Sequence, residues 1–289
     1  MSEVKIAAIM RAGAYSPNHI GNDAAIMNLV AEQLRKRGCE VKVYSEEQFL
    51  AGRVNEQIIV NMCRDPKSIS MLQQLEDSGR LIINSGYGIE NCVRERLTRI
   101  LLGSNIPYPE SLIVNTNEVV KGTLNKNEIS QCWIKRADSH AMHKEDVTYV
   151  RHAEEAQEML QEYFLRGIPR AVISRHLAGD LVKFYGVKGQ PFFYWFCPFV
   201  ANGGSYSYDV LNSGPGAIKT IGQKIKKMCQ RAADELNVKV YGGDCVISSS
   251  GDVNIISFND WPSYAPCRAE AASYIAKAVM AEIKEFRKH

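Results

Sequence analysis

The sequence predicts a doubly wound parallel α/β domain at the amino terminus, followed by an α+β region. Apolar strands and amphipathic helices alternate through residues 1 to about 113, which is typical of a parallel sheet covered by helices on both faces. Near residue 117 the pattern changes to short strands around a helix, which indicates an antiparallel sheet. The chain has 289 residues, of which 45% are hydrophobic and 23% charged, and this is enough globular sequence for two or three domains.

The amino-terminal region alternates four expected strands with three expected helices. The best-defined helix, 22–38, starts with the capping residues Asn22 and Asp23 and ends at Gly38. The segment I-P-Y-P at 106–109 then marks the end of the region. The expected strands are 5–10, 40–44, 57–62 and 81–84, and the expected helices are 22–38, 66–78 and 88–103.

The later region contains shorter strands, three helices and a hairpin. Two of the helices flank the hairpin, which we expect to turn at Ser250–Gly251. The other expected strands are 131–135, 147–150, 170–174, 182–187 and 191–196, and the expected helices are 153–166, 217–236 and 266–287.

Composition argues against several classes of partner. A net charge of +3 is too small to indicate a nucleic-acid partner. No apolar run is long enough to span a membrane, and the first ten residues are too charged for a signal peptide. The eight cysteines form no C-x-x-C pair, and several lie in apolar runs typical of buried, reduced thiols. We therefore expect a cytoplasmic protein.

The predicted hairpin brings three oxygen-bearing side chains together. If the hairpin is centred on its turn, paired residue numbers sum to 501, so Asp244 lies opposite Ser257. Asn259 shares the face of Ser257, because side chains alternate along a strand. Directly opposed Cβ atoms lie only about 5 Å apart, and such ligands suit Mg²⁺. The alternative is that Asp244 caps a turn and Asn259 merely ends a strand.

Three segments, in this order, resemble the ATP-grasp superfamily on the side of glutathione synthetase and the ribosomal-protein glutamate ligases. They are C-W-I-K-R at 132–136, A-V-I-S-R-H-L-A-G-D-L-V-K-F-Y-G-V at 171–187, and G-G-D-C-V-I at 242–247 with I-I-S-F-N-D-W-P-S at 255–263. The resemblance covers essentially the whole chain and implies an amino-terminal α/β domain followed by a two-lobed ATP-grasp. The implied domains are 1–113, 114–177 and 178–289.

The resemblance implies ATP and Mg²⁺ as cofactors. It places Lys135 near the α- and β-phosphates and Lys183 near the γ-phosphate. It also places the hinge 174–177 at the adenine and Asp180 at the ribose. A polyphosphate needs cationic side chains and metal together. Each lysine taken alone is as well explained as a charged side chain on the solvated protein surface. The implied ATP-binding residues are Lys135, Ser174, Arg175, His176, Leu177, Asp180 and Lys183, and the implied catalytic residues are Lys183 and Asp244.

For the metal, the resemblance implies Asp244 and Asn259 as ligands. The family usually has an acidic residue at position 257, where this chain has a serine. Asp260 is therefore a candidate third ligand, provided that the strand breaks there; Pro262 favours such a break. The alternative is that Asp260 bonds the backbone of its own turn.

Two further segments depart from the family pattern. The hinge usually carries Gln-Glu, and here it has Ser174-Arg175. The phosphate-covering loop is usually glycine-rich, but residues 136–146 contain no glycine. Either His140, His143 and Lys144 contact the phosphates, or this segment is a solvated loop.

The loop after the first strand carries the candidate acceptor site. Arg11, Asn18 and His19 lie close to the start of a helix, a favourable place for an anion. Arg64, at the end of the third strand, would point into the same crevice. We expect these residues to bind a carboxylate or phosphate of the acceptor. The alternative is that Asn18 and Asp23 only cap the helix.

These features predict an ATP-dependent carboxylate–amine ligase acting through an acyl phosphate on a small-molecule or peptide acceptor. One alternative is a kinase of the same fold, resembling the inositol-phosphate kinases, which phosphorylates a hydroxyl. Another is a non-catalytic ATP-binding protein, for which Ser257 and the glycine-free loop argue. Neither a nucleic-acid nor a membrane partner is expected, and a homodimer is left open.

Overall fold

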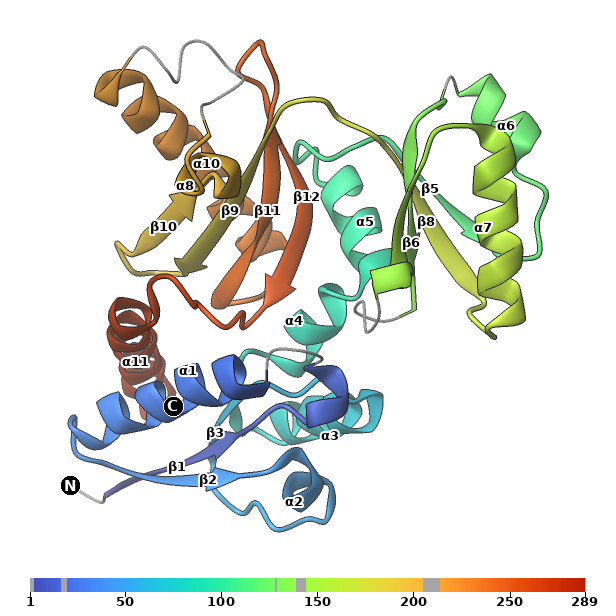
Figure 1. Cartoon of the computed structure of the whole chain (residues 1–289). Helices are drawn as coiled ribbons and strands as arrows, with labels where there is room; N and C mark the ends of the chain where they lie inside the picture. Colours follow the sequence, from blue (N-terminus) through green and yellow to red (C-terminus); the bar gives the residue numbers. More distant parts are fainter. Residues whose placement is uncertain (1–2, 17–19, 128, 139–143, 205–213, 289) are drawn as a thin grey trace.

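The computed structural model describes residues 3–16, 20–127, 129–138, 144–204 and 214–288. Within these residues the chain forms three four-stranded sheets (Figure 1). The first sheet is parallel and the other two are antiparallel. The predicted mixture of α/β and α+β architecture is therefore confirmed.

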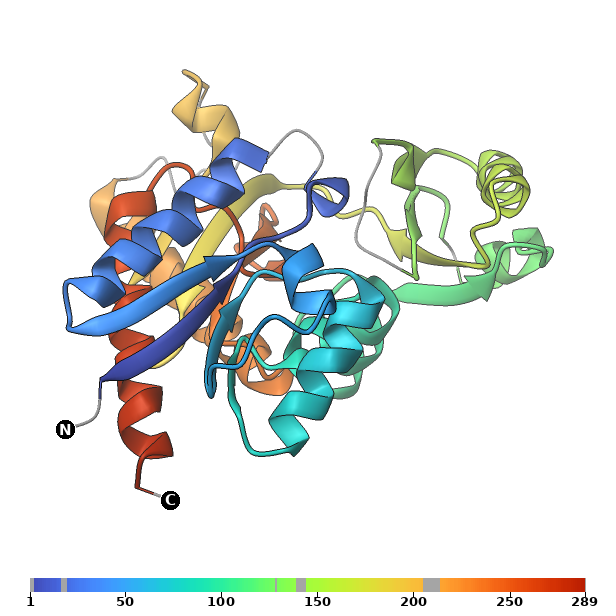
Figure 2. The same cartoon turned by 90° about the horizontal axis from the view of Figure 1, so that it is seen from below.

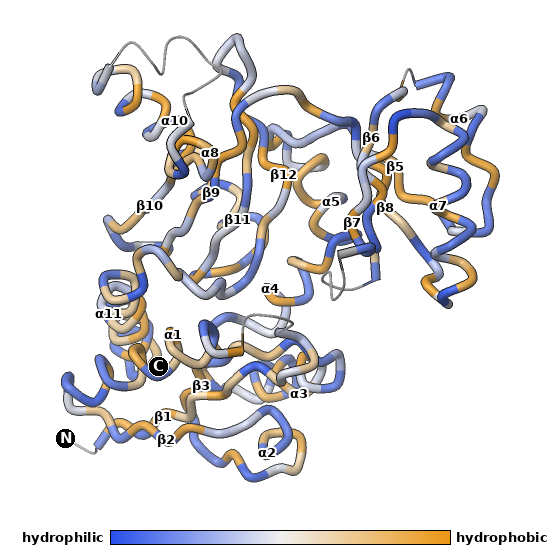
Figure 3. Tube along the Cα trace, in the orientation of Figure 1, coloured by the Kyte–Doolittle hydropathy of each residue, from blue (hydrophilic) through white to orange (hydrophobic). Residues whose placement is uncertain are grey.

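The amino-terminal sheet has the order β2-β1-β3-β4 and is buried on both faces. On β1, Ile6 and Ala8 pack against one pair of helices while Ala7 and Ile9 pack on the opposite side. This explains the continuous apolar run in the sequence, and β1 is orange along most of its length in Figure 3. The strands are β1 Val4–Ile9, β2 Cys39–Tyr44, β3 Ile58–Asn61 and β4 Leu81–Ile83.

Helices from both ends of the chain cover this sheet. The first face packs against α1 Ile20–Arg35 and α11 Arg268–Phe286, which lie side by side in both views (Figure 1, Figure 2). The second face packs against α2 Glu46–Leu50, α3 Pro66–Asp77 and α4 Gly86–Asn91. The short helix η1 Gly13–Tyr15 follows β1.

The central sheet has the order β5-β8-β6-β7 and packs on one side against α7. Ala156, Leu160 and Tyr163 recur at helical spacing and are fully buried against this sheet. The strands are β5 Ser111–Asn115, β6 Cys132–Arg136, β7 Val147–Val150 and β8 Arg170–Arg175. The helices are α6 Lys121–Lys126, η2 Lys144–Asp146 and α7 Ala153–Leu165.

The C-terminal sheet has the order β10-β9-β11-β12. One of its faces packs against α10 and α5, so its other face is left toward the central sheet. The strands are β9 Asp180–Val187, β10 Phe193–Phe196, β11 Val240–Ile247 and β12 Val253–Asp260. The helices are α5 Arg94–Gly103, α8 Pro198–Ala201 and α10 Pro215–Glu235.

The predicted register of the β11–β12 hairpin is confirmed at the residues that matter. Asp244 pairs with Ser257, and Gly242 pairs with Asn259. Beyond Asp244 a bulge shifts the pairing by one residue, so the symmetric register does not continue to the turn.

The predicted single helix at 88–103 is wrong. The chain forms α4 and then α5, because Val93 adopts an extended backbone with φ −63° and ψ 134° between them. This break allows α4 to stay on the amino-terminal sheet while α5 packs in the core of the C-terminal sheet. The proposed limit at residue 113 falls within β5, whose residues pair with β8.

The cysteines behave as small core residues. All eight are free thiols, and seven of them are buried. No helix among the described residues is long and apolar enough to cross a membrane.

Candidate active site

A cavity of about 410 Å³ lies between the central sheet and the C-terminal sheet. One end has apolar walls and the other end carries charges, an arrangement that suits a ligand with a planar apolar part and an anionic part. Trp133, Leu181 and Val246 form the apolar end, whereas Val147 and Ile256 line the cavity beside Lys135. The polar and charged lining is Arg94, Lys135, Ser174, Arg175, His176, Lys183, Asp244 and Ser257.

Lys135 is the buried cation of this cavity. It lies on β6, is only 5% exposed, and its Nζ donates a hydrogen bond to the carbonyl oxygen of Ile256 at 3.3 Å. Burial and, to a smaller extent, the nearby Arg94 guanidinium lower the pKa of Lys135 to about 7, against a smaller raising effect of Asp244. An anion in the cavity would favour the charged ammonium, so Lys135 is a functional candidate on physical grounds.

Arg94 is a second cation that sequence reasoning missed. It is the first residue of α5 and lines the cavity beside Lys135. Burial lowers its pKa, and its Nε has no hydrogen-bond partner in the part of the chain that the structure describes. Nothing in the sequence marks it, because it lies about forty residues before Lys135 in a segment that reads as the polar face of a helix.

The C-terminal sheet supplies the other charged residues. On adjacent strands, Lys183 of β9 pairs in register with Asp244 of β11, and Lys183 Nζ lies 2.7 Å from Asp244 Oδ1. Ser257 of β12 lies opposite Asp244 on the other side, and the Asn259 amide donates to Ser257 Oγ at 3.4 Å. The structure thus brings together the four residues that the hairpin argument and the resemblance predicted.

The hinge between the two sheets offers its backbone to the cavity. The N–H groups of Arg175 and His176 already donate to the carbonyl oxygens of Glu110 and Gln131, each at 2.9 Å. The N–H of Leu177 makes no hydrogen bond to any described residue and lines the cavity. Leu177 is therefore the hinge donor that remains for a ligand.

The hinge side chains are used to build the wall. The buried Ser174 hydroxyl accepts from Ser111 at 3.0 Å, and the Arg175 guanidinium bonds Glu110. The His176 ring accepts a hydrogen bond from Trp133 Nε1 at 3.1 Å, which fixes the indole at the apolar end. The hydrogen bonds of these side chains are thus made to other residues of the central sheet and of the segments beside it.

Asp180 is not brought to the cavity. Gly179 and Leu181 line it, whereas Asp180 is buried on the opposite face of β9. Burial and, to a smaller extent, the nearby Asp180 carboxylate raise the pKa of Cys197. The reason is strand alternation: Asp180 and Lys183 are three residues apart and point to opposite faces. The residue before this strand, Gly179, has φ +151°, and a Cβ there would lie 2.1 Å from the Ile247 carbonyl oxygen, so this position requires glycine.

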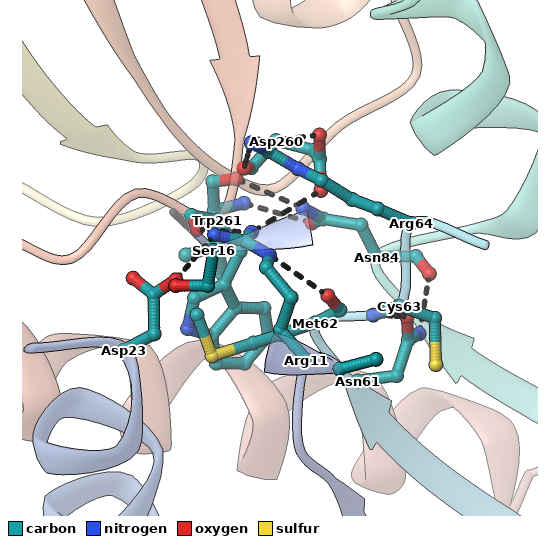
Figure 4. Close-up of polar contacts among 12 residues, drawn as sticks. Arg11, Ser16, Asp23, Asn61, Met62, Cys63, Arg64, Asn84, Asp260 and Trp261 are labelled. Carbon is teal, nitrogen blue, oxygen red and sulfur yellow. Dashed lines mark hydrogen bonds and ion pairs between the residues drawn. The ribbon is translucent and has the colours of Figure 1, made fainter. Parts of the chain in front are cut away.

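Asp260 is likewise on the wrong face for the metal role. β12 continues unbroken through Asp260, which pairs with Tyr241. Its carboxylate is 1% exposed and faces two arginines of the amino-terminal domain (Figure 4): Arg64 at 3.6 Å and Arg11 at 4.0 Å. The break that Pro262 suggested comes one residue later, at Trp261, which has φ +35°.

Arg11 is a structural clamp in this cluster. Its guanidinium donates to Asp23 at 2.8 Å and to the Trp261 carbonyl oxygen at 3.0 Å, and its side chain is 4% exposed (Figure 4). Asp23 also accepts from Ser16 at 2.6 Å. These bonds tie the end of β1 and the start of α1 to the residue after β12.

Arg64 differs from Arg11 because it reaches a second cavity. Its side chain is 12% exposed and lines a space of about 700 Å³ between the amino-terminal domain and the start of the 136–146 loop. Burial and, to a smaller extent, the nearby Arg11 guanidinium lower the pKa of Arg64 to about 10, against a raising effect of Asp260. The other polar residues of this second cavity are Tyr15, Ser70, Gln73, Glu90, Glu95, Arg96, Arg136 and Asp138.

Some of the expected ligands fall outside the described residues. Asn18 and His19 lie in the segment 17–19, and His140 and His143 lie in 139–143. For Lys144 the structure describes the backbone alone.

The residues present fit one magnesium ion shared with phosphates. Asp244 supplies a carboxylate, and Ser257 and Asn259 supply neutral oxygens on the same face. Mg²⁺ is usually held by one or two protein carboxylates together with substrate phosphates and water. Among the described residues no group of three or more His, Cys, Asp or Glu side chains could hold a metal by itself, so the phosphates would have to complete the site.

Comparison with known proteins gives structural neighbours. No family model and no curated protein matches the chain. The D-alanine–D-alanine ligase of Coxiella burnetii superimposes with a TM-score of 0.73 at 11% identity, over 99% of this chain and 97% of that chain. That of Bacillus anthracis, complexed with ATP, gives 0.71 at 12% identity over 99% of both chains.

Two further neighbours come from other ligases. A RimK domain ATP-grasp protein from Sphaerobacter thermophilus gives a TM-score of 0.68 at 14% identity, covering 95% of this chain and 98% of that one. The ATP-grasp ligase PsnB, complexed with a precursor peptide and AMPPNP, gives 0.62 at 16% identity, covering 98% and 100%. The chain has the ATP-grasp fold. At these identities the likeness shows the fold alone, which the sequence predicted. The activity has to be argued from the residues of the site.

Proposed function

We propose that this ATP-grasp protein is an ATP-dependent carboxylate–amine ligase. The observation that carries the proposal is the cavity between the two antiparallel sheets, where Lys135, Lys183 and Asp244 converge at one end of an apolar slot. A buried ammonium group there has a single carbonyl partner, and a nucleotide polyphosphate would supply the missing anion. Neighbours of the same fold are complexed with ATP and AMPPNP.

The ligand would bind with its base at the apolar end. Trp133 and Leu181 would sandwich the ring, and the Leu177 N–H would donate to it. Lys135 and Lys183 would hold the phosphates, with Arg94, which the structure adds to the predicted set. Asp180 faces away from the cavity, so we assign the ribose no side-chain ligand from β9.

Asp244 and Asn259 would hold magnesium, with the hydroxyl of Ser257 beside them. When bound, the ion neutralises charge on the transferring phosphoryl group. The protein's own groups position the nucleotide and stabilise its charge. The ammonium groups of Lys135 and Lys183 would stabilise the negative charge of the phosphates, and the apolar end of the cavity would hold the base in place.

The reaction has two steps. An oxygen of the acceptor carboxylate attacks the γ-phosphorus of ATP, the bond to the β-phosphate oxygen breaks, and ADP leaves. The resulting acyl phosphate is then attacked by an amine nitrogen, which loses a proton while inorganic phosphate departs. The products are an amide, ADP and phosphate.

The second cavity is our candidate for the acceptor. It adjoins the phosphate end through the 136–138 segment, and Arg64 lies on its wall. A volume of about 700 Å³ and a lining of both arginines and carboxylates would suit a small molecule or a peptide segment that carries a carboxylate. The PsnB neighbour is complexed with a precursor peptide.

A second candidate function is nucleotide binding without ligation. The observation that favours it is Ser257, which stands directly opposite Asp244 and leaves the hairpin with one carboxylate at the metal position. The kinase alternative needs a hydroxyl acceptor and forms no acyl phosphate.

Hydroxylamine trapping separates these functions. The protein would be incubated with ATP, Mg²⁺, hydroxylamine and a panel of amino acids, N-acetyl amino acids and dicarboxylic acids. Hydroxamate that depends on ATP supports the ligase, because only the ligase among these three functions forms an acyl phosphate for hydroxylamine to attack. ADP and a phosphorylated hydroxyl compound without hydroxamate would support the kinase. Stabilisation by ATP without turnover of any acceptor would support the non-catalytic protein.

We also propose a reducing, cytoplasmic location, supported by eight unpaired cysteines. The domain limits 1–113, 114–177 and 178–289 remain our proposal, with the adjustment that β5 from Ser111 belongs with the central sheet.

A further inference from the structure

The carboxylate at the charged end of the nucleotide cavity is already held by an ammonium group. In the described part of the chain Asp244 is the single carboxylate that lines this cavity. The strand register puts it between Lys183 on one side and Ser257 on the other. Lys183 Nζ is 2.7 Å from Asp244 Oδ1, and the two side chains are 42% and 24% exposed. A ligand can therefore reach both groups.

The remaining oxygen ligands at this end are neutral. The Asn259 amide nitrogen donates to Ser257 Oγ at 3.4 Å, which leaves the amide oxygen as the end of Asn259 that can face a cation. A divalent ion placed here meets one protein charge, that of Asp244. One or two carboxylates together with phosphate oxygens are the usual protein share of a magnesium site.

A second divalent ion would have little to hold it. Paired metal ions lie about 3.5–4 Å apart and repel each other. A second ion here would depend on shared phosphate oxygens, because no carboxylate besides Asp244 lines the cavity among the described residues. The lining residues next to Asp244 are instead cations, namely Lys135, Lys183 and Arg94. Lys183 already occupies a position within hydrogen-bond distance of the carboxylate.

We propose that the site holds its nucleotide with one divalent cation, and that the Lys183 ammonium supplies the positive charge that a second cation would otherwise supply. This rests on the proposed ATP-binding function. When the phosphates enter, Lys183 exchanges its bond to Asp244 for one to a phosphate oxygen. The released Asp244 oxygen then becomes a ligand of the single cation. Metal and nucleotide therefore bind together, and the metal alone binds weakly.

The experiment counts Mn²⁺ ions bound per AMPPNP, from the electron paramagnetic resonance signal of free Mn²⁺ at saturating AMPPNP. We expect one Mn²⁺ per nucleotide for the wild-type protein and for Ser257→Ala. Ser257→Glu adds a carboxylate opposite Asp244 and should raise the count to two. Ser249→Glu, the same change at an exposed position of the hairpin turn, is the matched control and should leave the count at one.

A second measurement isolates the lysine. Without nucleotide, Lys183→Met should tighten Mn²⁺ binding several-fold, because Asp244 loses its internal partner. With AMPPNP present the same variant should bind the nucleotide more weakly. An unchanged Mn²⁺ affinity in Lys183→Met would contradict the exchange.

The outcomes distinguish this inference from the function on which it rests. AMPPNP binding with two Mn²⁺ ions, or with none, in the wild-type protein overturns the single-cation inference and leaves nucleotide binding standing. Failure of AMPPNP to bind at any Mn²⁺ concentration overturns the proposed function and this inference with it. The wild-type count decides the matter even if Ser257→Glu fails to fold.

Discussion

Replacing Lys135 by methionine should make the free protein more stable while it removes nucleotide binding. Methionine keeps the unbranched shape of the side chain and removes the buried amine. In the unfolded chain a lysine has a pKa of 10.5, whereas burial holds that of Lys135 at about 7. At pH 7 this difference costs the folded state roughly 4 kcal/mol, at about 1.4 kcal/mol per unit of pKa.

The net gain is smaller than this cost. Methionine cannot donate to the Ile256 carbonyl oxygen, which Lys135 Nζ reaches at 3.3 Å. Leaving that acceptor unsatisfied costs about 1–3 kcal/mol. We therefore expect the free energy of unfolding of Lys135→Met at pH 7 to exceed that of the wild type by about 1–3 kcal/mol.

The pH dependence of the free energy of unfolding tests the lowered pKa of Lys135 directly. Between pH 7 and 10.5 the unfolded wild-type chain binds more protons at Lys135 than the folded one, so wild-type stability rises with pH there. Methionine does not titrate. The advantage of Lys135→Met is therefore largest below pH 7 and should shrink by roughly 3 kcal/mol between about pH 6 and pH 9.

Urea unfolding at three pH values between 6 and 9 measures this difference. Lys227→Met, which removes one charge from the exposed side of α10, is the control for a general loss of charge. ATP with Mg²⁺ should raise the unfolding midpoint of the wild type and of Lys227→Met, but not that of Lys135→Met. A difference between wild type and Lys135→Met that stays constant with pH would refute the depressed pKa of the buried amine.

Four further outcomes are expected. At pH 8 ATP binding should take up a proton, because the phosphates raise the pKa of Lys135 from about 7. Calorimetry in buffers of different ionisation enthalpy detects this proton uptake, and a binding enthalpy that is the same in all buffers would contradict it. Lys183→Ala should weaken the ATP-dependent rise in melting temperature, and an unchanged rise would exclude Lys183 from the phosphate site. Asp260→Asn removes the buried charge that faces Arg11 and Arg64. It should lower the free energy of unfolding by about 3–5 kcal/mol and leave the Mg²⁺ requirement unchanged. A steeper Mg²⁺ requirement at unchanged stability would restore Asp260 as a metal ligand. Arg64→Ala should raise the KM for the acceptor far more than the KM for ATP, and an equal effect on both would move the acceptor site away from the second cavity.

Asp180 and Asp260 show where the sequence argument stopped short. Asp180 was assigned to the ribose by the family resemblance, and Asp260 was proposed as a metal ligand on the condition that β12 breaks there. Strand alternation alone separates Asp180 from Lys183, and Asp260 from Asn259. In the hairpin the predicted pairing of Asp244 with Ser257 is present, but the pairs next to the turn are shifted by one residue, and the bulge after Asp244 accounts for the difference.

The sequence by itself determined the order of most elements and the mixed sheet architecture, since these depend on local periodicity, and it predicted the pairing of Asp244 with Ser257. Only the tertiary structure decided that Arg94 lines the same cavity as Lys135, that Lys183 pairs with Asp244, and that Asp260 faces two arginines from the amino-terminal region. Those contacts join segments as far apart in the chain as Arg11 and Asp260, and burial between packed sheets lowers the pKa of Lys135. Neither long-range contact nor burial of a charge is encoded in local sequence pattern; both arise when separate layers pack together.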